Sequence, residues 1–465
     1  MGALPKLRKV LSVATQYQVI NPATEEIVTT VDMFDLAQTD AAIARSAKAF
    51  ESWRNVAPGD RAKMLRTFAA KVSEHREELA NLEIANSGHT KGNALWEADN
   101  VANVLNYYSA APERLFGRQI PVAGGVDFTF KEPLGVIGII VPWNFPMPIA
   151  GWGFAPALAA GNTVVLKPAE LTPLTAIRLG ELALEAGIPE GVFQVLPGKG
   201  SIVGERFVTH PSVRKIVFTG STEVGKHIMV GCADQVKRLT LELGGKSANV
   251  IFADGDIEKA AAAAPGSVFD NAGQDCCARS RILVQRSVFD RFMSLLETSV
   301  KAFRVEDPRL DTSEMGPLIS AKQFETVSSF LGSNVAFTGS KPEGKGYWMA
   351  PTVVTPKDAN DRAWREEIFG PIVAVLPFED EADAIRLAND TEYGLSGSIW
   401  TRDVGRAFRV GRAIESGNLS VNSHSSVRYW TPFGGFKQSG LGRELGPDAP
   451  DAFTEVKNIF IATGE

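Results

Sequence analysis

A chain of 465 residues is too long for a single hydrophobic core, so two or three domains are expected. Its 44% hydrophobic and 22% charged residues are typical of a soluble globular protein, and its net charge of −6 argues against a nucleic-acid-binding surface. The three cysteines are too few for a disulfide framework, no zinc-ligand spacing is present, no apolar run is as long as a membrane span, and the weakly basic start lacks the pattern of a secretory signal. We therefore expect a cytoplasmic protein with no metal site.

The first part of the chain is predicted to be helical. Between residues 35 and 115, apolar side chains recur at helical spacing, for instance at Leu65, Phe68 and Val72. Residues 117–130 are then expected to form a β-hairpin with a Gly-Gly turn.

From residue 135 onward, apolar runs of strand length alternate with helical stretches. The runs are 136–141, 163–166, 192–196, 215–218, 239–243 and 248–252. Fully apolar strands separated by helices predict a parallel sheet buried on both faces, which is a doubly wound α/β fold. A second α/β block is expected at about 256–417. Ligands of such sheets bind where the strands end at their carboxyl edge.

Two adjacent cysteines, Cys276 and Cys277, lie in the segment N-A-G-Q-D-C-C-A-R-S-R. A cysteine is a strong nucleophile as the thiolate, and positive neighbours such as Arg279 and Arg281 favour that form. A free cysteine is more often a buried packing residue. The local sequence leaves both interpretations open.

Two strand ends are candidates for dinucleotide binding. In the segment F-T-G-S-T-E-V-G, Gly220 permits a tight turn, Ser221 and a helix N-terminus offer donors to a pyrophosphate, and Gly225 allows close packing. Lys167 and Glu170 follow another strand and could hold the hydroxyls of an adenosine ribose. An ordinary strand-to-helix turn and a solvated turn are the alternatives.

Two other polar residues are candidates for chemistry. Asn144, in the loop P-W-N-F-P, presents an amide that could stabilise an oxyanion or simply cap the following helix. Glu242 precedes a Gly-Gly pair and is a candidate general base if burial raises its pKa, although an isolated glutamate is more often a surface charge. The segments E-E-I-F-G-P at 366–371 and P-F-G-G-F-K-Q-S-G at 432–440 could each be only a turn.

In this order and at these separations, the motifs resemble those of the NAD(P)-dependent aldehyde dehydrogenase superfamily, of the non-acylating, hydrolytic type. The resemblance covers about residues 21–457. It implies that Cys276 attacks an aldehyde, that Asn144 and the main-chain N–H of Cys276 hold the oxyanion, and that hydride passes to a nicotinamide. Glu242 would activate the water that releases the acid, and Glu444 would assist proton transfer. Relatives that acylate coenzyme A generally lack a carboxylate at 242.

The resemblance also implies a cofactor site. Its residues would be Trp143, Lys167, Glu170, Gly220, Ser221, Gly225, Gly244, Glu367 and Phe369, with Lys167 and Glu170 at the adenosine ribose, Gly220 and Ser221 at the pyrophosphate, and Glu367 and Phe369 at the nicotinamide ribose. A carboxylate at 170 repels a 2′-phosphate, so NAD is favoured, with NADP as the alternative.

The residues that match the family's substrate channel are Phe145, Trp152, Asp270, Asp275, Cys277 and Phe433, with Glu97 at its mouth. Carboxylates there would attract a primary ammonium, so an ω-aminoaldehyde such as 4-aminobutyraldehyde is the first expectation. Relatives that take trimethylammonium aldehydes often have an aromatic residue at position 270, so a betaine-aldehyde-type cage looks incomplete. If the two aspartates cap local backbone instead, the channel suits plain aliphatic or aromatic aldehydes.

The sequence departs from the family pattern at two positions. Gly153 stands where most hydrolytic relatives have a lysine, which puts any proton path through that lysine in doubt. Cys277 directly follows the nucleophile; a packing role is expected, and a vicinal disulfide that switches Cys276 off is the alternative.

The resemblance implies a domain plan and an assembly. The NAD-binding domain would comprise 1–116 and 134–243, the catalytic domain 244–430, the oligomerisation element 117–133 and 448–465, and the active-site loop 431–447. An exposed strand edge needs a partner, so we expect a homodimer or homotetramer with a small-molecule aldehyde as its other partner and no nucleic acid or membrane. A cysteine hydrolase or esterase would need a nearby histidine, for which His424 is the candidate. A non-catalytic relative should have lost Cys276 or Glu242.

Overall fold

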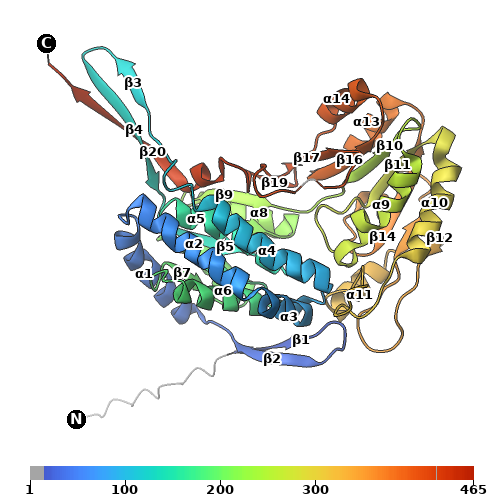
Figure 1. The fold of residues 1–465 in the computed structure, drawn as a ribbon, viewed down its shortest axis with the longest axis horizontal. Coiled ribbons are helices and arrows are strands. Elements are labelled where there is room, and N and C mark those ends of the chain that lie inside the picture. The colour runs from blue at the N-terminus through green and yellow to red at the C-terminus, as the bar shows by residue number, and fades with distance from the viewer. Residues whose placement is uncertain (1–14, 333, 426, 465) are drawn as a thin grey trace, which may run out of the picture.

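The computed structural model describes residues 15–332, 334–425 and 427–464. Its body holds two large, mostly parallel sheets with helices packed on them, and a three-stranded arm extends from the body (Figure 1). The predicted α/β class with doubly wound sheets is confirmed.

The first sheet has the strand order β19-β9-β8-β5-β6-β7 and is parallel except at β19. Its strands are β5 (Val136–Ile140), β6 (Thr163–Lys167), β7 (Phe193–Val195), β8 (Val213–Thr219), β9 (Arg238–Glu242) and β19 (Gly440–Leu441). Successive residues of a strand point to opposite faces. In β5, Ile137 and Ile139 accordingly join one hydrophobic cluster, whereas Val136 and Ile140 join another. Both faces of this sheet are therefore buried, as its apolar strands predicted.

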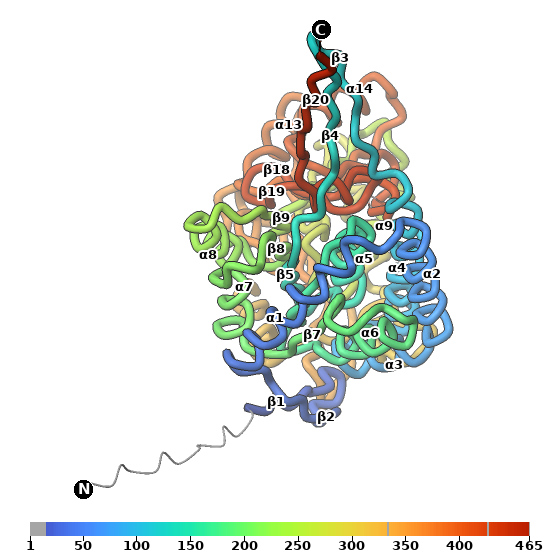
Figure 2. The backbone as a smooth tube through the Cα atoms, turned by 90° about the vertical axis from the view of Figure 1, so that its left-hand side faces the viewer, coloured from blue at the N-terminus to red at the C-terminus, as the bar shows by residue number. Residues whose placement is uncertain are grey.

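Helices supply the other half of each cluster. The helices α2 (Pro58–Glu74), α4 (Lys91–Tyr108), α5 (Pro146–Ala159) and α6 (Leu174–Glu185) form one side, whereas α7 (Glu205–Thr209), α8 (Thr222–Ala233) and part of α1 (Leu36–Trp53) form the other. Figure 2 shows α7 and α8 on one side of β5 and β8, and α2, α4 and α6 on the other side. With α3 (Arg76–Ser87), these elements confirm the helical segment predicted between residues 35 and 115.

The second sheet has the order β12-β13-β14-β11-β10-β16-β17 and is parallel except at β12. Its strands are β10 (Ala248–Ile251), β11 (Arg281–Gln285), β12 (Val335–Thr338), β13 (Thr352–Val354), β14 (Ile372–Phe378), β16 (Ser396–Trp400) and β17 (Asn418–Val421). Around it lie α9 (Ile257–Phe269), α10 (Phe289–Ala302), α11 (Ala321–Ser328), α12 (Arg362–Arg365), α13 (Glu381–Asn389) and α14 (Val404–Ala413). Side chains from this sheet and its helices form a third large cluster.

The arm is an antiparallel sheet of β3 (Gln119–Val122), β4 (Gly125–Pro133) and β20 (Thr454–Ala462), with β4 in the centre. The predicted hairpin is confirmed, and the C-terminal strand pairs with it along nine residues, from Thr454 opposite Pro133 to Ala462 opposite Gly125. The remaining described strands form two antiparallel two-stranded sheets. One consists of β1 (Gln16–Ile20) and β2 (Ile27–Asp32), and the other of β15 (Tyr393–Gly394) and β18 (Phe436–Lys437). Among the described helices, none has the combination of length and apolar character that a membrane span requires.

The chain crosses between the two large sheets directly after Glu242. That residue ends β9, and β10 of the second sheet begins at Ala248. At the same place, Gly440 of β19 pairs with Glu242 and so draws the C-terminal loop to the carboxyl edge of the first sheet. Segments distant in sequence thus converge where ligands of parallel sheets bind.

Candidate active site

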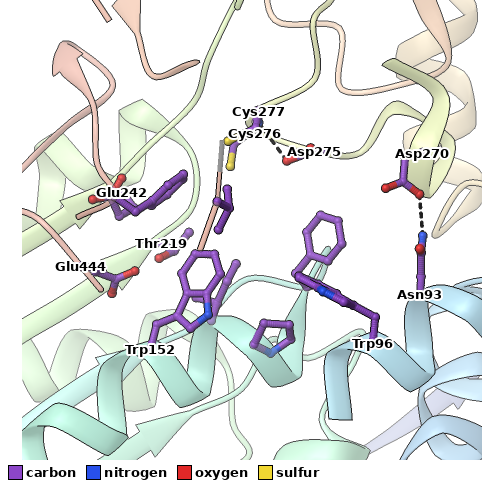
Figure 3. A pocket seen from close by; sticks show the side chains of 15 residues that line it. Asn93, Trp96, Trp152, Thr219, Glu242, Asp270, Asp275, Cys276, Cys277 and Glu444 are labelled. Atoms are coloured by element: carbon purple, nitrogen blue, oxygen red, sulfur yellow. Dashed lines mark hydrogen bonds between the residues drawn. The ribbon is translucent and has the colours of Figure 1, made fainter. Parts of the chain in front are cut away.

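Two cavities meet at Cys276 (Figure 3). The larger has a volume of about 340 Å³ and is lined by Asn93, Trp96, Phe145, Pro148, Ile149, Trp152, Thr219, Glu242, Asp270, Asp275, Cys276, Cys277, Val427, Phe433 and Glu444. The smaller has a volume of about 230 Å³ and is lined by Pro142, Trp143, Asn144, Thr219, Gly220, Ser221, Leu243, Gly244, Cys276, Glu367 and Phe369. Cys276 and Thr219 line both cavities, so Cys276 lies at the boundary between the two compartments.

Glycines allow the Cys276 loop to pack between neighbouring motifs. Gly273 has φ +71°, and a Cβ there would lie 2.1 Å from the carbonyl oxygen of Gly370 in the E-E-I-F-G-P segment. A Cβ on Gly245, in the Gly-Gly pair after Glu242, would lie 2.3 Å from the carbonyl oxygen of Cys276. Both separations are too short for a real side chain. The three sequence motifs are therefore parts of one packed unit.

The Cys276 thiol is half-buried and lies next to the Cys277 thiol. Its hydrogen bond with Cys277 raises its pKa well above the ordinary value, and burial and the Asp275 carboxylate act in the same direction. Arg279 does interact electrostatically with both cysteines, but this attraction is outweighed, because the Cys276 pKa rises. Arg279 donates to the carbonyls of Cys277 and His424, and Arg281 donates to main-chain carbonyls elsewhere. The thiol therefore needs a base, because its surroundings do not ionise it.

Two carboxylates, Glu242 and Glu444, face the larger cavity from one side (Figure 3). They are 2% and 4% exposed, and neither accepts a hydrogen bond from any described residue. Burial raises the pKa of Glu242 well above its ordinary value, and repulsion by Glu444 adds to this. Burial also raises the pKa of Glu444 to about 8. Paired, desolvated carboxylates of this kind can accept and release protons near neutral pH.

Gly434 explains how the C-terminal loop reaches Glu242. Its φ is +153°, and a Cβ there would lie 2.7 Å from Oε1 of Glu242. Main-chain hydrogen bonds in both directions between Phe433 and Glu444 close this loop. The P-F-G-G segment, which could have been only a turn, therefore forms part of the cavity wall.

On the opposite side of the cavity lies Asp270, held by Asn93 (Figure 3). Asn93 Nδ2 donates to Asp270 Oδ1 at 2.6 Å, and the main-chain N–H of Asn271 donates to the same oxygen at 3.0 Å. The main-chain N–H of Cys277 donates to Asp275 Oδ1 at 2.8 Å. Both aspartates therefore line the cavity and also bind local backbone, and burial raises the pKa of each.

Asn144 lies in the wall of the smaller cavity together with Cys276. Its Nδ2 donates to the carbonyl of Gln274 at 3.0 Å, which places the amide against the cysteine loop. The main-chain carbonyl oxygen of Asn144 accepts from Asn271 Nδ2 at 2.8 Å. Asn144 does not cap α5, whose first turn has no side-chain cap. Because an amide nitrogen carries two hydrogens, one remains for a ligand oxygen.

The smaller cavity contains the expected donors for a dinucleotide. Ser221 is the N-cap of α8, and a Cβ on Gly225 would lie 2.5 Å from Leu243, so a glycine is needed for the close packing of that helix. Glu367 Oε1 accepts from the Gly245 N–H at 2.8 Å, and burial raises its pKa to about 7. A Cβ on Gly244 would lie 2.4 Å from Glu367. Trp143 and Phe369 meet edge to face, with ring centroids 5.3 Å apart.

Three predicted cofactor residues line neither cavity: Lys167, Glu170 and Gly225. Lys167 ends β6, is buried, and donates from Nζ to the carbonyl of Pro168 at 2.8 Å, while burial lowers its pKa to about 8. Glu170 is partly exposed and accepts from the Gly200 N–H at 3.1 Å. Both residues therefore lie at or just after the carboxyl end of β6, and neither lines a cavity at Cys276.

The sequence analysis misplaced Glu97 and missed several lining residues. Glu97 is completely buried against His89 and does not lie at the channel mouth. Asn93 and Trp96, also on α4, line the larger cavity instead. Their only signal was their separation of three residues, which places both on one helix face.

The chain matches the family model described as "Aldehyde dehydrogenase family" over residues 10–459. It is 40% identical to aminoaldehyde dehydrogenase 2 of Pisum sativum across 95% of this chain and 91% of that protein. It is 37% identical to betaine aldehyde dehydrogenase 1 of Oryza sativa across 96% and 92%. The solved structure of betaine aldehyde dehydrogenase from Staphylococcus aureus in complex with NAD+ is 38% identical, with a TM-score of 0.94, 97% of this chain and 92% of that chain being covered.

Proposed function

The chain belongs to the aldehyde dehydrogenase family and oxidises an aldehyde, and we propose that it converts an ω-aminoaldehyde to the corresponding acid with NAD through a thioester on Cys276. The observation that carries this proposal is the position of Cys276 between two cavities. The larger offers carboxylates and aromatic rings to a substrate, and the smaller offers a helix N-terminus and Glu367 to a dinucleotide.

The residues of the smaller cavity fit a dinucleotide. The N-terminus of α8 at Ser221 offers free main-chain N–H groups to a pyrophosphate. Glu367, which the glycine at 244 allows to approach closely, would hold the hydroxyls of a ribose. Bound NAD would supply the acceptor for the hydride. Glu170 favours NAD over NADP, because its negative charge would repel a 2′-phosphate.

Acylation begins when Glu242 removes the Cys276 proton. The resulting thiolate forms a C–S bond to the aldehyde carbon, and the carbonyl π electrons move to the oxygen. The free N–H of the Asn144 amide and the main-chain N–H of Cys276 hold that oxyanion. Its collapse expels the aldehyde hydrogen as hydride and leaves a thioester on Cys276. The raised thiol pKa supports the need for a base at this step.

Deacylation uses the same carboxylate. Glu242 first passes the Cys276 proton to Glu444, which releases it to solvent, so Glu242 is then a base again. It takes a proton from water, whose oxygen attacks the thioester carbon, and the C–S bond breaks to release the acid and the thiolate. The thiolate takes that proton back from Glu242, which restores the Cys276 thiol. No described residue donates a hydrogen bond to either carboxylate. Both are therefore free to take up and release a proton, which supports this role.

The proposed substrate class rests on the far wall of the larger cavity. Asp270 there would attract the ammonium group of an ω-aminoaldehyde such as 4-aminobutyraldehyde. The similarity to an aminoaldehyde dehydrogenase supports this choice. Betaine aldehyde is the second candidate, because Trp96, Phe145, Trp152 and Phe433 line the same cavity and aromatic faces attract quaternary ammonium groups.

We also propose that the protein is a homodimer or homotetramer joined through the arm. β20 is an edge strand and exposes Val456, Ile459, Phe460 and Ile461. An exposed apolar edge of this length favours pairing with another chain. The first sheet with its helices would be the NAD-binding domain, and the second would be the catalytic domain.

The test is NADH formation, followed by absorbance at 340 nm with a panel of aldehydes. We expect 4-aminobutyraldehyde to give the highest kcat/KM, with NAD preferred over NADP. Higher kcat/KM for betaine aldehyde would select the second candidate. Higher kcat/KM for pentanal than for either cation would contradict the proposed substrate class.

A further inference from the structure

A buried cluster of three ionisable residues lies behind the wall of the larger cavity. It consists of Glu83 on α3, His89 in the turn after α3, and Glu97 on α4, with exposed fractions of 0%, 2% and 0%. One oxygen or ring nitrogen from each residue lies within 4.8 Å of the others. His89 Nδ1 is hydrogen-bonded to the Glu97 carboxyl group, and Glu83 accepts from Thr175 Oγ1 at 2.7 Å. Nothing in the proposed reaction uses these residues directly.

The cluster is placed by the turn between the two helices. Gly88 ends α3 with φ +76°, and a Cβ there would lie 2.7 Å from Pro22 and 2.9 Å from Pro317. Thr90 then begins α4 as its N-cap. The residue between them, His89, is therefore directed into the interior. Glu97 lies two turns along α4 and closes the cluster from the other side.

The cluster contacts the end of the loop that follows β5 and the first turn of α5. The His89 ring lies against Phe145, with ring centroids 5.4 Å apart, and the main chain of Asn144 is a hydrogen-bond partner that raises the pKa of His89. The main chain of Met147 acts on Glu97 in the opposite sense and lowers its pKa. Met147 lies in the first turn of α5, which begins at Pro146 without a side-chain cap. The free N–H groups of that turn favour a nearby acceptor, and the effect of Met147 on the Glu97 pKa shows that the carboxyl group lies close to them.

The protonation state follows from the burial. Burial is the largest cause that raises the pKa of Glu97 well above its ordinary value, and it lowers the pKa of His89. Both shifts favour the neutral pair, in which the Glu97 carboxyl group donates to His89 Nδ1 and the ring carries its proton on Nε2. A neutral imidazole with one occupied nitrogen has a fixed tautomer and a fixed orientation. It can then donate only toward the main chain of Asn144.

We propose that His89, held by Glu97 and Glu83, is a positioning residue for the proposed reaction: it fixes the 144–147 loop so that the Asn144 amide meets the oxyanion. This inference rests on the proposed function, because it assumes that Asn144 stabilises the oxyanion. His89 touches neither the cavity nor the substrate. Its contribution is the direction of the amide, and a small misalignment of such a donor costs much of its effect.

The experiment is a double-mutant cycle of His89→Ala and Asn144→Ala, with the single-turnover rate of NADH formation as the readout. We expect His89→Ala to slow that rate about tenfold while KM changes less than about twofold, since one oxyanion donor is worth about 10²–10³ in kcat. In the Asn144→Ala background, the same substitution should cost less than about twofold. His89→Gln, which keeps an acceptor for Glu97 and a donor for the loop, should restore most of the rate. A structural role alone would give equal costs in both backgrounds.

One control variant and one replacement variant make the result decisive. His227→Ala removes a histidine from an exposed His–Glu pair, with Nε2 2.9 Å from Glu205 Oε2, and should leave the rate unchanged. If His89→Ala does not fold, His89→Asn takes its place in the cycle, because it stays polar but is too short to span from Glu97 to the loop. Additive costs, or a His89→Gln enzyme as slow as the alanine variant, would overturn the proposal. A wild type that forms no NADH would instead contradict the proposed function.

Discussion

Asp270→Asn tests the charge in the larger cavity with little change of shape. An asparagine has nearly the volume of aspartate and keeps an oxygen to accept from Asn93 Nδ2 and from the Asn271 N–H, which bind Asp270 at 2.6 and 3.0 Å. The loop that leads to Cys276 should therefore keep its conformation. Only the negative charge is removed.

The expected magnitude follows from the environment of that carboxylate. Burial raises the pKa of Asp270, and the nearby Asp275 adds to this, so an approaching ammonium group stabilises the ionised form. Two unit charges about 4 Å apart attract by about 1 kcal/mol in water and about 4 kcal/mol at an effective dielectric constant near 20. Part of this gain offsets desolvation of the ammonium. We expect a loss of about 1.4 kcal/mol or more, which is a tenfold or larger increase in KM for 4-aminobutyraldehyde.

The assay compares two substrates in three enzymes. Pentanal has a similar length and no charge, so its KM should change less than about twofold in Asp270→Asn. Asp99→Asn is the matched control, because Asp99 lies on α4, which also carries Asn93, but its side chain is 46% exposed and paired with Arg76. It should affect neither substrate. Equal changes for both aldehydes in Asp270→Asn would refute the electrostatic reasoning and the aminoaldehyde assignment, but not the dehydrogenase activity.

Three other predictions follow from the same geometry. Cys276→Ala should abolish NADH formation and keep NAD binding measured by calorimetry, whereas Cys277→Ala should keep covalent turnover; the reverse pattern would move the nucleophile by one residue. A general base must be deprotonated, so kcat should rise with pH as the Glu242 and Glu444 pair loses a proton. In Glu444→Gln this rise in kcat should occur at lower pH, because repulsion by Glu444 no longer raises the Glu242 pKa. A rise at the same pH as in the wild type would contradict the electrostatic coupling of the two carboxylates. Light scattering at micromolar concentration should give a dimer or tetramer mass, and removal of β20 should give a monomer; an intact chain that is monomeric would rule out assembly through the arm.

The buried strands and the motifs at their ends were predictable because they follow local rules. β5 is a continuous apolar run and β8 contains one at 216–218, and burial of both faces of a parallel sheet demands such runs. The segment around Gly273 could not be assigned from its local sequence, and its glycine is explained only by the backbone contact with Gly370 that the fold creates. The resemblance then joined the motifs that periodicity could not connect.

Side-chain direction was the limit of that prediction. Arg279 and Arg281 follow Cys276 closely in sequence. However, Arg279 donates to the main-chain carbonyl of Cys277 and Arg281 donates to that of Lys246, so neither forms a hydrogen bond with the Cys276 thiol in the described structure. Glu97 was expected at a channel mouth. Instead, the turn at Gly88 directs His89 toward Glu97, and both side chains are buried. These outcomes depend on which neighbours tertiary packing brings close, and no local pattern contains that information.

Position 153 on α5 is a glycine, and the charge of Glu444 is balanced by a lysine from another element. A Cβ on Gly153 would face Ile139 at 3.0 Å, so that position meets the apolar side of β5. A lysine from β8 lies near Glu444 instead: Lys215 is 2% exposed and donates from Nζ to Thr240 Oγ1 at 2.7 Å. Burial lowers its pKa to about 8, and Glu444 opposes that shift, while Lys215 in turn opposes the rise of the Glu444 pKa, also to about 8. Because the two groups have similar pKa values, a proton that leaves Glu242 enters a pair in which neither charge state is strongly disfavoured near neutral pH.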